Sequence, residues 1–347
     1  MKPTVDMEYV LGLGKELIEI PSVGGDCRRA MNRVRDEFTA LGLKPKETNK
    51  GALIASQPGR TQNGGRIVSA HVDTLGAVVR RIEPNGTLRL LTVGGFSWNC
   101  VEAENLLVHT ADGKTVEGSL MPDKASRHAF AEEVTTMVRD DDHVHVRLDE
   151  PVQTAEDVRR LGIEVGDIVS FETRFRRTPA GFVKSRYLDD KICLACCFGA
   201  IKALKDASLL PSRPVHWYAS NYEEIGHGVS VIPDGVTECL AVDIAIVAEG
   251  NNSSERAVSI LAKDSRTPYP VDFRHRLQKL AQAEGIPYRV DTPYRYGSDA
   301  SMGALAGFDF NFAAMGPGVD ASHHYERTHI DALKATCGLL MAYLLEE

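Results

Sequence analysis

Apolar and polar positions along the chain follow two different patterns, one typical of helices and one typical of strands. Near the start, the apolar residues that recur at spacings of three and four are Met31, Val34, Phe38 and Leu41. That spacing predicts a helix with one buried face. Residues 52–56 and 66–71 are short apolar runs separated by a turn-rich stretch, and they predict two strands. The unbroken apolar run at 67–70 is typical of a buried strand in a parallel sheet.

The pattern changes after about residue 79. Residues 80–175 consist of short alternating runs separated by frequent turns, which indicates a small β-rich domain of barrel or sandwich type. We expect strands at 87–92, 106–110, 144–148 and 168–175. One short helix is predicted over 154–161, with Thr154 as its N-cap.

From about residue 185 the sequence pattern again predicts strands that alternate with helices. The predicted helices are 192–204, 273–284, 301–306 and 330–346, and the predicted strands are 215–220, one ending the segment 238–248, 286–290 and 308–314. Such alternation predicts a mostly parallel sheet with helices on both faces. We therefore expect a three-layer α/β/α sandwich interrupted by an inserted β-barrel-like domain. The predicted domains are a first catalytic part at 1–78, the insertion at 79–176 and a second catalytic part at 177–347.

Composition narrows the class of protein. The 347 residues are 43% hydrophobic and 25% charged, with a formal net charge of -8, so nothing favours nucleic acid or a membrane as partner. Seven cysteines in a chain of this size favour a reducing cytoplasm over a disulfide framework. The N-terminus has no apolar signal-peptide core, and no apolar run reaches the ~18–20 residues of a membrane span. We therefore expect a cytoplasmic, unprocessed protein.

Several polar residues stand where predicted strands or helices meet loops. His71 ends an apolar strand, so it could bind a metal while Asp73 holds its other ring nitrogen, or the two could form a hydrogen-bonded pair alone. Asp189 and Asp190 precede an apolar helix, where they could be ligands or only caps.

Three further places complete the candidate set. Glu223 and Glu224 follow a strand, and could be solvated or could supply one metal ligand and one base. Asp243 interrupts an apolar strand, which is costly unless it is paired, bound to a cation or hydrogen-bonded to backbone. Histidines 323, 324 and 329 precede the last helix and could be ligands or bystanders.

Taken together, these residues are more specific than any one of them. Two histidines and three or four carboxylates at the strand ends of one sheet match a two-metal hydrolase site, in which one carboxylate bridges both ions. A separate carboxylate must then accept the proton of the attacking water. Mixed nitrogen and oxygen ligands without thiolate suit zinc, cobalt or manganese better than magnesium or calcium.

In this order the motifs resemble the M42 family of metallo-aminopeptidases, which includes glutamyl and tetrahedral aminopeptidases. The matching segments are 69–76, 161–167, 188–191, 223–226 and 296–300, and the β-rich insertion falls where that family carries its inserted domain. The resemblance covers nearly the whole chain. It implies a peptidase that removes N-terminal residues from short peptides, and a homo-oligomer from a dimer up to a hollow dodecamer.

The resemblance also implies a role for each residue. One of two divalent ions, zinc above all, would be held by His71, Asp189 and Asp243, and the other by Asp189, Glu224 and His323. Asp189 would bridge both ions. Asp73 would orient His71, and Glu223 would be the general base that activates a metal-bound water.

The sequence departs from the family pattern at three places. Lys191 stands where the family has arginine, and the expected final ligand His323 precedes Glu326 by three positions instead of four, which leaves His324 as the alternative. Residues 316–329 replace the usual loop and resemble M42-type hydrolases associated with the osmolyte N-acetylglutaminylglutamine amide. This implies an alternative function, a deacylase or amidase on a small N-acylated or amidated dipeptide. A silent scaffold protein is the remaining alternative, and it would have a degraded ligand set.

Overall fold

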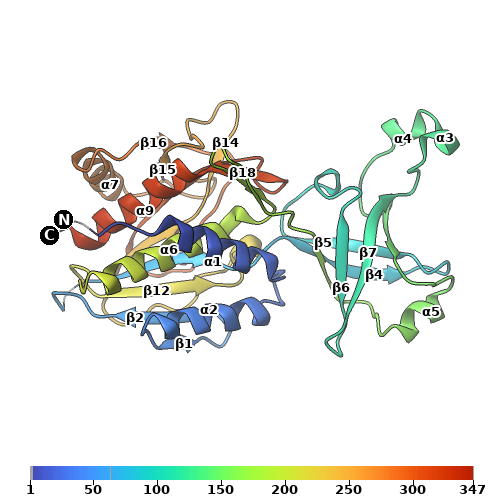
Figure 1. Ribbon diagram of the computed structural model, residues 1–347, viewed down its shortest axis with the longest axis horizontal. Helices are drawn as coiled ribbons and strands as arrows, with labels where there is room; N and C mark the ends of the chain where they lie inside the picture. Colours follow the sequence, from blue (N-terminus) through green and yellow to red (C-terminus); the bar gives the residue numbers. More distant parts are fainter. Residues whose placement is uncertain (1–2, 63, 347) are drawn as a thin grey trace. The chain divides into compact units, whose positions relative to one another are not determined.

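The computed structural model describes residues 3–62 and 64–346. The chain divides into two units (Figure 1). Unit 1 comprises Met1–Asp73 and Arg174–Glu347, and unit 2 is the continuous segment Thr74–Thr173. The β-rich segment is thus inserted into an α/β unit.

Unit 1 is built on a large mixed sheet. The described residues form twelve strands in it, with the path β1-β2-β12-β3-β13-β17-β18-β11-β10 and with β14, β15 and β16 attached beside β17. The strand bounds are Pro45–Glu47 (β1), Leu53–Gln57 (β2), Gly65–His71 (β3), Arg176–Arg177 (β10), Phe182–Ser185 (β11), Val215–Ser220 (β12), Val236–Val242 (β13), Ala245–Val247 (β14), Val258–Leu261 (β15), Tyr288–Asp291 (β16), Asn311–Asp320 (β17) and Glu326–His329 (β18).

The centre of the sheet is parallel and its flanks are antiparallel. Strands β12, β3, β13 and β17 pair in parallel, as the apolar strand run had predicted. The pairs β1–β2, β2–β12, β17–β18 and β18–β11 are antiparallel. The flanking strands β1, β10, β11 and β18 were not predicted, because two- to four-residue strands carry almost no periodicity of their own.

Successive residues of the central strands serve two different cores. Val68 and Ala70 of β3 belong to the larger core, whereas Ile67 belongs to a smaller core on the opposite face. Leu240 and Cys239 of β13 divide in the same way. Alternate residues of each strand point to opposite faces of the sheet, and both faces are covered. This explains why the sequence of such a strand is a continuous apolar run.

Helices cover both faces of the sheet (Figure 1), which confirms the three-layer α/β/α prediction. Helix α8 packs with the smaller core, and the other five helices pack with the larger one. Their bounds are Met7–Glu19 (α1), Arg28–Ala40 (α2), Leu188–Asp206 (α6), Val271–Ala283 (α7), Asp299–Leu305 (α8) and Ile330–Leu345 (α9). The helices predicted from apolar spacing at α2, α6, α7 and α9 are confirmed within a few residues.

Unit 2 is a closed barrel, with the order β4-β5-β8-β7-β6-β9 in the described residues. The strands are Gly76–Ile82 (β4), Leu88–Val93 (β5), Asn105–His109 (β6), Thr115–Pro122 (β7), Val144–Leu148 (β8) and Ile168–Phe171 (β9). Three short helices are Arg127–Phe130 (α3), Glu133–Thr136 (α4) and Ala155–Arg160 (α5). Thr154 caps α5 as predicted, in a capping box with Asp157. The barrel has its own apolar core, including Val79, Leu90 and Val146.

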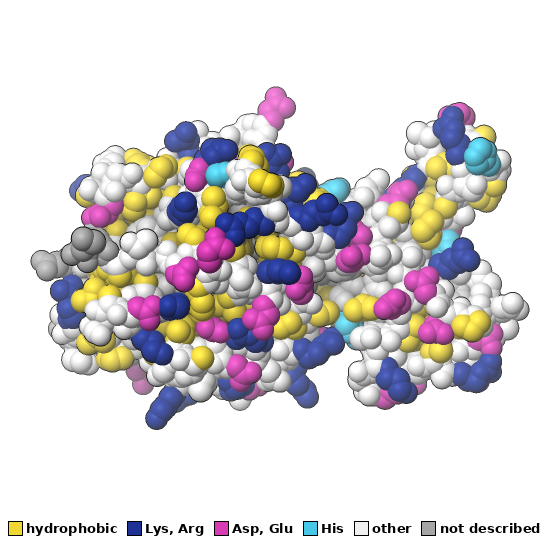
Figure 2. All heavy atoms as spheres, in the orientation of Figure 1, with side chains coloured by type: hydrophobic (Ala, Val, Ile, Leu, Met, Phe, Trp, Pro, Cys, Tyr) yellow, Lys and Arg dark blue, Asp and Glu magenta, His cyan; other side chains and the backbone are white. Residues whose placement is uncertain are grey.

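Two sequence expectations about element bounds need correction. The strand expected at 168–175 ends at Phe171, and the strand expected at 308–314 begins only at Asn311 and runs on to Asp320. Phe175 in the first case, and Phe308 and Phe310 in the second, lie in the adjoining loops and extended the apolar pattern beyond the hydrogen-bonded ladder. Within the described residues, no helix is both long and apolar enough to cross a membrane. Figure 2 shows basic and acidic side chains on both units of the face in view.

Candidate functional site

The candidate residues meet at one edge of the unit 1 sheet. Strand β3 ends at His71, opposite Ser220 at the end of its neighbour β12. On the other side, β13 ends at Val242, immediately before Asp243. Because these three adjacent strands are parallel, their carboxyl ends lie side by side. Ligand sites of open α/β sheets form at such edges.

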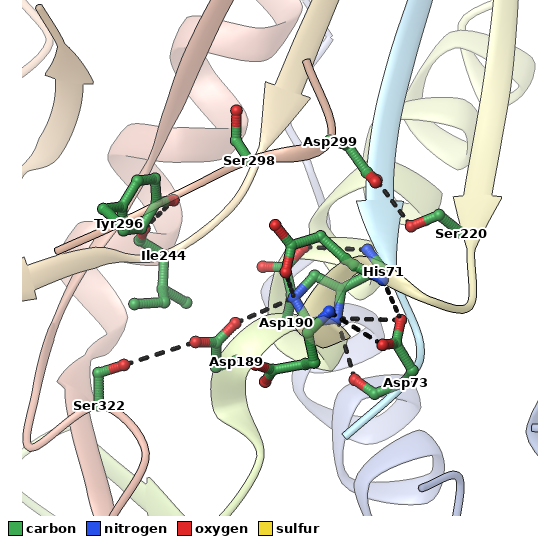
Figure 3. A network of polar contacts seen from close by, with 12 residues as sticks. His71, Asp73, Asp189, Asp190, Ser220, Ile244, Tyr296, Ser298, Asp299 and Ser322 are labelled. Atoms are coloured by element: carbon green, nitrogen blue, oxygen red, sulfur yellow. Dashed lines mark hydrogen bonds and ion pairs between the residues drawn. The ribbon is translucent and has the colours of Figure 1, made fainter. Parts of the chain in front are cut away.

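His71 is buried and its two ring nitrogens face different groups (Figure 3). Its Nε2 lies 3.1 Å from Oδ1 of Asp189 and 3.8 Å from Oε2 of Glu223. Its Nδ1 lies 2.9 Å from the backbone carbonyl oxygen of Asp73 and 3.6 Å from that residue's carboxylate. A carbonyl acceptor at Nδ1 keeps the proton there and leaves Nε2 free to act as a ligand.

Asp189 lies between two histidines. Its Oδ1 contacts His71, and its Oδ2 lies 3.5 Å from Nε2 of His323. His323 Nε2 also lies 3.4 Å from Oε2 of Glu224. One carboxylate with a different imidazole beside each oxygen has the arrangement of a bridging ligand.

The start of helix α6 bends away from helical geometry to present this carboxylate. Asp189 and Asp190 have non-helical backbone angles, and no side-chain cap hydrogen bond forms there. The capping interpretation of this acid pair is therefore not supported. Instead, Asp190 Oδ2 accepts a hydrogen bond from the backbone N–H of His71 at 3.2 Å, which links α6 to the end of β3.

Asp73 holds the loop that follows β12. Its carboxylate accepts hydrogen bonds from the backbone N–H groups of Glu223 and Glu224, each at 3.1 Å. Both glutamates lie in the short 3₁₀ helix Glu223–Ile225 (η2). Asp73 thereby fixes where the two glutamate side chains begin.

The loop between β17 and β18 contributes His323 and is held by Glu326. Glu326 Oε1 accepts from the backbone N–H of His323 and Oε2 from that of Asp189, both at 3.1 Å. His323 has a backbone φ of 64°, in the left-handed region. The neighbouring His324 instead has its Nδ1 2.7 Å from the backbone nitrogen of Tyr325. His329, the third histidine of this stretch, caps α9.

Two groups of side chains in the described part of the chain have potential ligand atoms within 4.8 Å of one another. They are His71 with Asp189 and Glu224, and His71 with Asp190 and Asp243. The second group contains Asp190, to which the sequence analysis gave no separate role, in the place where Asp189 was expected. Asp299 also borders the site: it accepts hydrogen bonds from Ser220 Oγ at 2.7 Å and from the backbone of Val229 (Figure 3).

The carboxylates crowd one another in a buried space. Burial and the charge of Asp189 raise the pKa of Glu224 to about 7 against the opposing effect of His323. Burial and neighbouring acids likewise raise the pKa of Glu223 and of Asp243. Asp189 differs: burial opposes its ionisation, but hydrogen bonds from the two histidines outweigh that effect and lower its pKa. Protons taken up by the carboxyl groups, or cations bound between them, relieve the repulsion among these acids.

The donor set fits divalent metal ions. It combines imidazole nitrogen with carboxylate oxygen, and neither of the two groups of potential ligands contains a cysteine. Such mixed ligands suit zinc, cobalt or manganese. The residues present therefore fit a divalent metal ion.

Comparisons with known proteins agree with this geometry. The family model described as M42 glutamyl aminopeptidase matches residues 51–339. The YhfE protein of Bacillus subtilis, which bears an aminopeptidase name, is 39% identical over 331 residues, covering 95% of each chain. Lysyl aminopeptidase of Pyrococcus furiosus is 25% identical over 301 residues, covering 84% of this chain and 83% of that protein.

Solved structures share the fold. An aminopeptidase of Desulfurococcus kamchatkensis superposes with a TM-score of 0.87 at 21% identity, over 98% of this chain and 95% of its own. The TET1 peptidase of Pyrococcus horikoshii, described as assembling into a tetrahedron or a large octahedral shell, gives a TM-score of 0.82 at 21% identity, over 97% and 100% of the two chains. M42 peptidases depend on metal ions. The chain belongs to the M42 glutamyl aminopeptidase family and is a peptide-bond hydrolase.

Proposed function

We propose that this protein is a dinuclear metal-dependent aminopeptidase that removes N-terminal residues from short peptides, with unit 1 as the catalytic domain. The observation that carries the proposal is the position of Asp189, whose two carboxylate oxygens each lie within 3.5 Å of a different histidine. A structural ion pair would need only one of these histidines. Two imidazoles on opposite oxygens leave room for an ion on each side.

In this proposal one ion is held by His71, Asp189 and Asp243, and the other by Asp189, Glu224 and His323. Asp190 lies within ligand range of His71 and Asp243 and supports the first set by its bond to the His71 backbone. Zinc is the proposed metal, with cobalt and manganese as substitutes. When bound, such ions polarise the scissile carbonyl and lower the pKa of water.

Glu223 is the proposed general base. Its carboxylate is buried and lies 3.8 Å from the ligand nitrogen of His71, beside the first proposed ion. From there it would accept the proton of the attacking water and pass it to the departing amine. Asp73 is a positioning residue, because it fixes the backbone of Glu223 and Glu224.

The relatives reported above are aminopeptidases by name, which favours peptides as substrates over the N-acylated or amidated dipeptides of the alternative function. The structural comparison supports a homo-oligomer, because the TET1 peptidase, which has this fold, is described as assembling into a tetrahedron or a large octahedral shell.

Replacing Glu223 with Gln tests the proposal. The amide keeps the shape of the side chain but cannot accept a proton, so we expect turnover to fall by roughly 10²–10⁴-fold. Turnover is measured on a panel of free dipeptides and their N-acetylated counterparts, and metal content by elemental analysis.

The metal content should stay at two ions per chain in Glu223→Gln. Glu284→Gln, a change at the end of α7, is the matched control and should leave turnover unchanged. Near-normal turnover in Glu223→Gln would show that the base is another residue. Turnover of only the blocked dipeptides would contradict the aminopeptidase proposal.

A further inference from the structure

The turn between β1 and β2 brings Lys50 to the segment that carries the proposed base. Strand β2 pairs with β12 in antiparallel fashion, and Leu53 at the start of β2 lies opposite Ala219 near the end of β12. The turn that precedes β2 therefore lies beside the loop that follows β12. That loop begins with residues 221–227, which include the whole of η2.

Backbone hydrogen bonds fix the shape of this turn. The N–H of Thr48 donates to the carbonyl of Ala52, and the N–H of Gly51 donates to the carbonyl of Thr48, each at 2.9 Å. Gly51 has a backbone φ of 88°, which favours glycine, and a Cβ added there would lie only 3.2 Å from Nδ2 of Asn221. The turn can therefore approach Asn221 closely, and the backbone of Lys50 has a defined position.

Lys50 contacts both ends of segment 221–227. At one end, its backbone carbonyl accepts a hydrogen bond from Nδ2 of Asn221 at 2.6 Å. At the other end, its Nζ donates to the backbone carbonyl of His227 and lies 2.8 Å from Nδ1 of the same residue. A single residue thus connects the two ends of the segment.

Between these two contacts, segment 221–227 closes on itself. The N–H of Gly226 donates to the carbonyl of Glu223 at 2.8 Å, and the N–H of His227 donates to the carbonyl of Tyr222 at 3.0 Å. These bonds make the segment a compact turn. A displacement of its ends would therefore be passed on to the side chain of Glu223.

The ammonium group of Lys50 is only partly exposed, and in the described part of the chain it forms no ion pair with a carboxylate. Besides the contacts with His227, it lies 5.3 Å from the centroid of the Tyr222 ring, which stacks on the His227 ring. Burial lowers the pKa of this amine, and the attraction of Asp299 and Asp73 opposes that effect. A surface lysine that only improves solubility would not be held in this way.

We propose that Lys50 is a positioning residue for the general base, because it holds both ends of the segment in which Glu223 lies. The inference rests on the proposed function, in which Glu223 accepts the proton of the attacking water. Asp73 fixes the middle of the segment through the N–H groups of Glu223 and Glu224, and Lys50 fixes its ends. A displacement of a catalytic group by about 1 Å can cost roughly 100-fold in rate.

Lys50→Met tests the inference, because methionine keeps most of the apolar stem but cannot donate to the His227 carbonyl. We expect kcat on a free dipeptide to fall by about tenfold or more, with KM changed by less than about twofold and both metal ions retained. Lys46→Met, at an exposed position of β1, is the matched control and should keep the kcat of the unaltered protein. The thermal unfolding midpoints of the two variants should agree within about 4 °C.

A double variant separates a positioning role from a merely structural one. Because Lys50 acts through Glu223, Lys50→Met should lower the residual kcat of Glu223→Gln by less than about twofold. An equal fractional loss in both backgrounds would overturn the inference, as would unaltered kcat, loss of a metal ion or a larger fall of the unfolding midpoint in Lys50→Met.

The single variants also distinguish this inference from the proposed function. Near-normal turnover in Glu223→Gln would mean that the proposed base is wrong. If Glu223→Gln is impaired and Lys50→Met is not, the base assignment stands and only the role of Lys50 fails.

Discussion

Single side chains at the candidate site take their orientation from groups outside the ligand set. Glu326 holds the backbones of Asp189 and His323, Asp73 holds that of Glu223, and Asp190 holds that of His71. Such outer contacts decide ligand geometry in metal sites, and their loss typically costs 10–100-fold in metal affinity or activity. The acids that surround the site are therefore not interchangeable with its ligands.

The two adjacent histidines allow a sharp test at the residue scale. His323→Ala removes the nitrogen that lies beside both Asp189 and Glu224, so we expect the variant to hold one ion per chain in place of two. His324→Ala is the matched control and should keep two, since its ring contacts the backbone of Tyr325. Elemental analysis after reconstitution measures both. Loss of an ion in His324→Ala with retention in His323→Ala would reverse the proposed assignment.

Lys191 is a fully buried lysine next to the acid pair. Its Nζ donates to the backbone carbonyls of Leu17 and Ile20, at 2.9 and 2.7 Å, and so ties the end of α1 to the start of α6. Burial lowers the pKa of this amine to about 7. Lys191→Met leaves two buried carbonyls without a donor but also removes the cost of burying an ammonium group. We expect a net loss of about 1–3 kcal/mol in the free energy of unfolding.

Urea denaturation of the metal-free protein measures this loss. Lys205→Met lies on the same helix and removes one exposed bond to the Ala40 carbonyl, so it should cost less than about 0.5 kcal/mol. Equal unfolding midpoints for the two variants would show that the buried bonds of Lys191 contribute nothing net.

At the scale of elements, the central strands connect two polar clusters through an apolar middle. Strand β3 has Arg66 at its start and His71 at its end, and β13 has Glu238 at its start and Asp243 beyond its end. Parallel strands place all their amino ends at one edge and all their carboxyl ends at the other. The arginine cluster and the acid cluster follow from this polarity of the sheet.

Glu238 should make the free energy of unfolding depend on pH. Burial opposes its ionisation, but hydrogen bonds from Arg276 and Arg213 outweigh burial and lower its pKa from 4.5 to about 2. A carboxyl group whose pKa is lower in the folded than in the unfolded protein stabilises the fold at pH values above its unfolded pKa, here about 4.5. That stabilisation is lost as the pH falls toward the folded pKa of about 2. With allowance for solvent screening, we expect Glu238→Gln to cost about 2 kcal/mol at pH 7.

The difference in unfolding free energy between Glu238→Gln and the unaltered protein should narrow by about 1 kcal/mol between pH 5 and pH 3. The other charged groups at this position are Arg66 and Glu346, and burial raises the pKa of Glu346. Both proteins share these groups, so only the part of their titration that the Glu238 charge influences enters the comparison. A difference that stays constant or widens over this range would contradict the assigned role of the arginine pairs.

At the scale of the whole molecule, the barrel of unit 2 and the sheet of unit 1 have separate apolar cores. The two units differ in how the chain forms them. Unit 2 is one continuous segment, whereas unit 1 is formed by the two segments that precede and follow unit 2 in the sequence. Unit 1 therefore depends on contacts between residues more than 100 positions apart, as between β3 and β12.

Assembly is the property of the whole molecule that sedimentation can test. We expect the protein to sediment at micromolar concentration as a multiple of its 38.0 kDa mass, because the proposed homo-oligomer requires it. Sedimentation velocity over a tenfold concentration range, with metal present and after chelation, measures the mass. A single species of one chain mass under both conditions would rule out the proposed assembly.

Local pattern alone determined much of the fold. The apolar spacing predicted α2 and α9, and the apolar run at Val215–Ser220 predicted β12 with the same bounds that it has in the structure. These elements could be read from the sequence because each buries a face whose period depends only on neighbours a few residues away. The inserted barrel and the strand-end position of His71 were predictable for the same reason.

Tertiary structure alone decided how the polar residues combine. No local signal could show that Glu326 would hold Asp189, that Asp190 would join His71 and Asp243, or that Lys191 would reach the end of α1. Sequence spacing also could not show which of His323 and His324 faces the site. The left-handed backbone at His323 sends the two side chains in different directions, and this conformation is known only from the structure. These contacts join residues that the chain brings together over a hundred or more positions, and the energy of a buried charge depends on every partner around it.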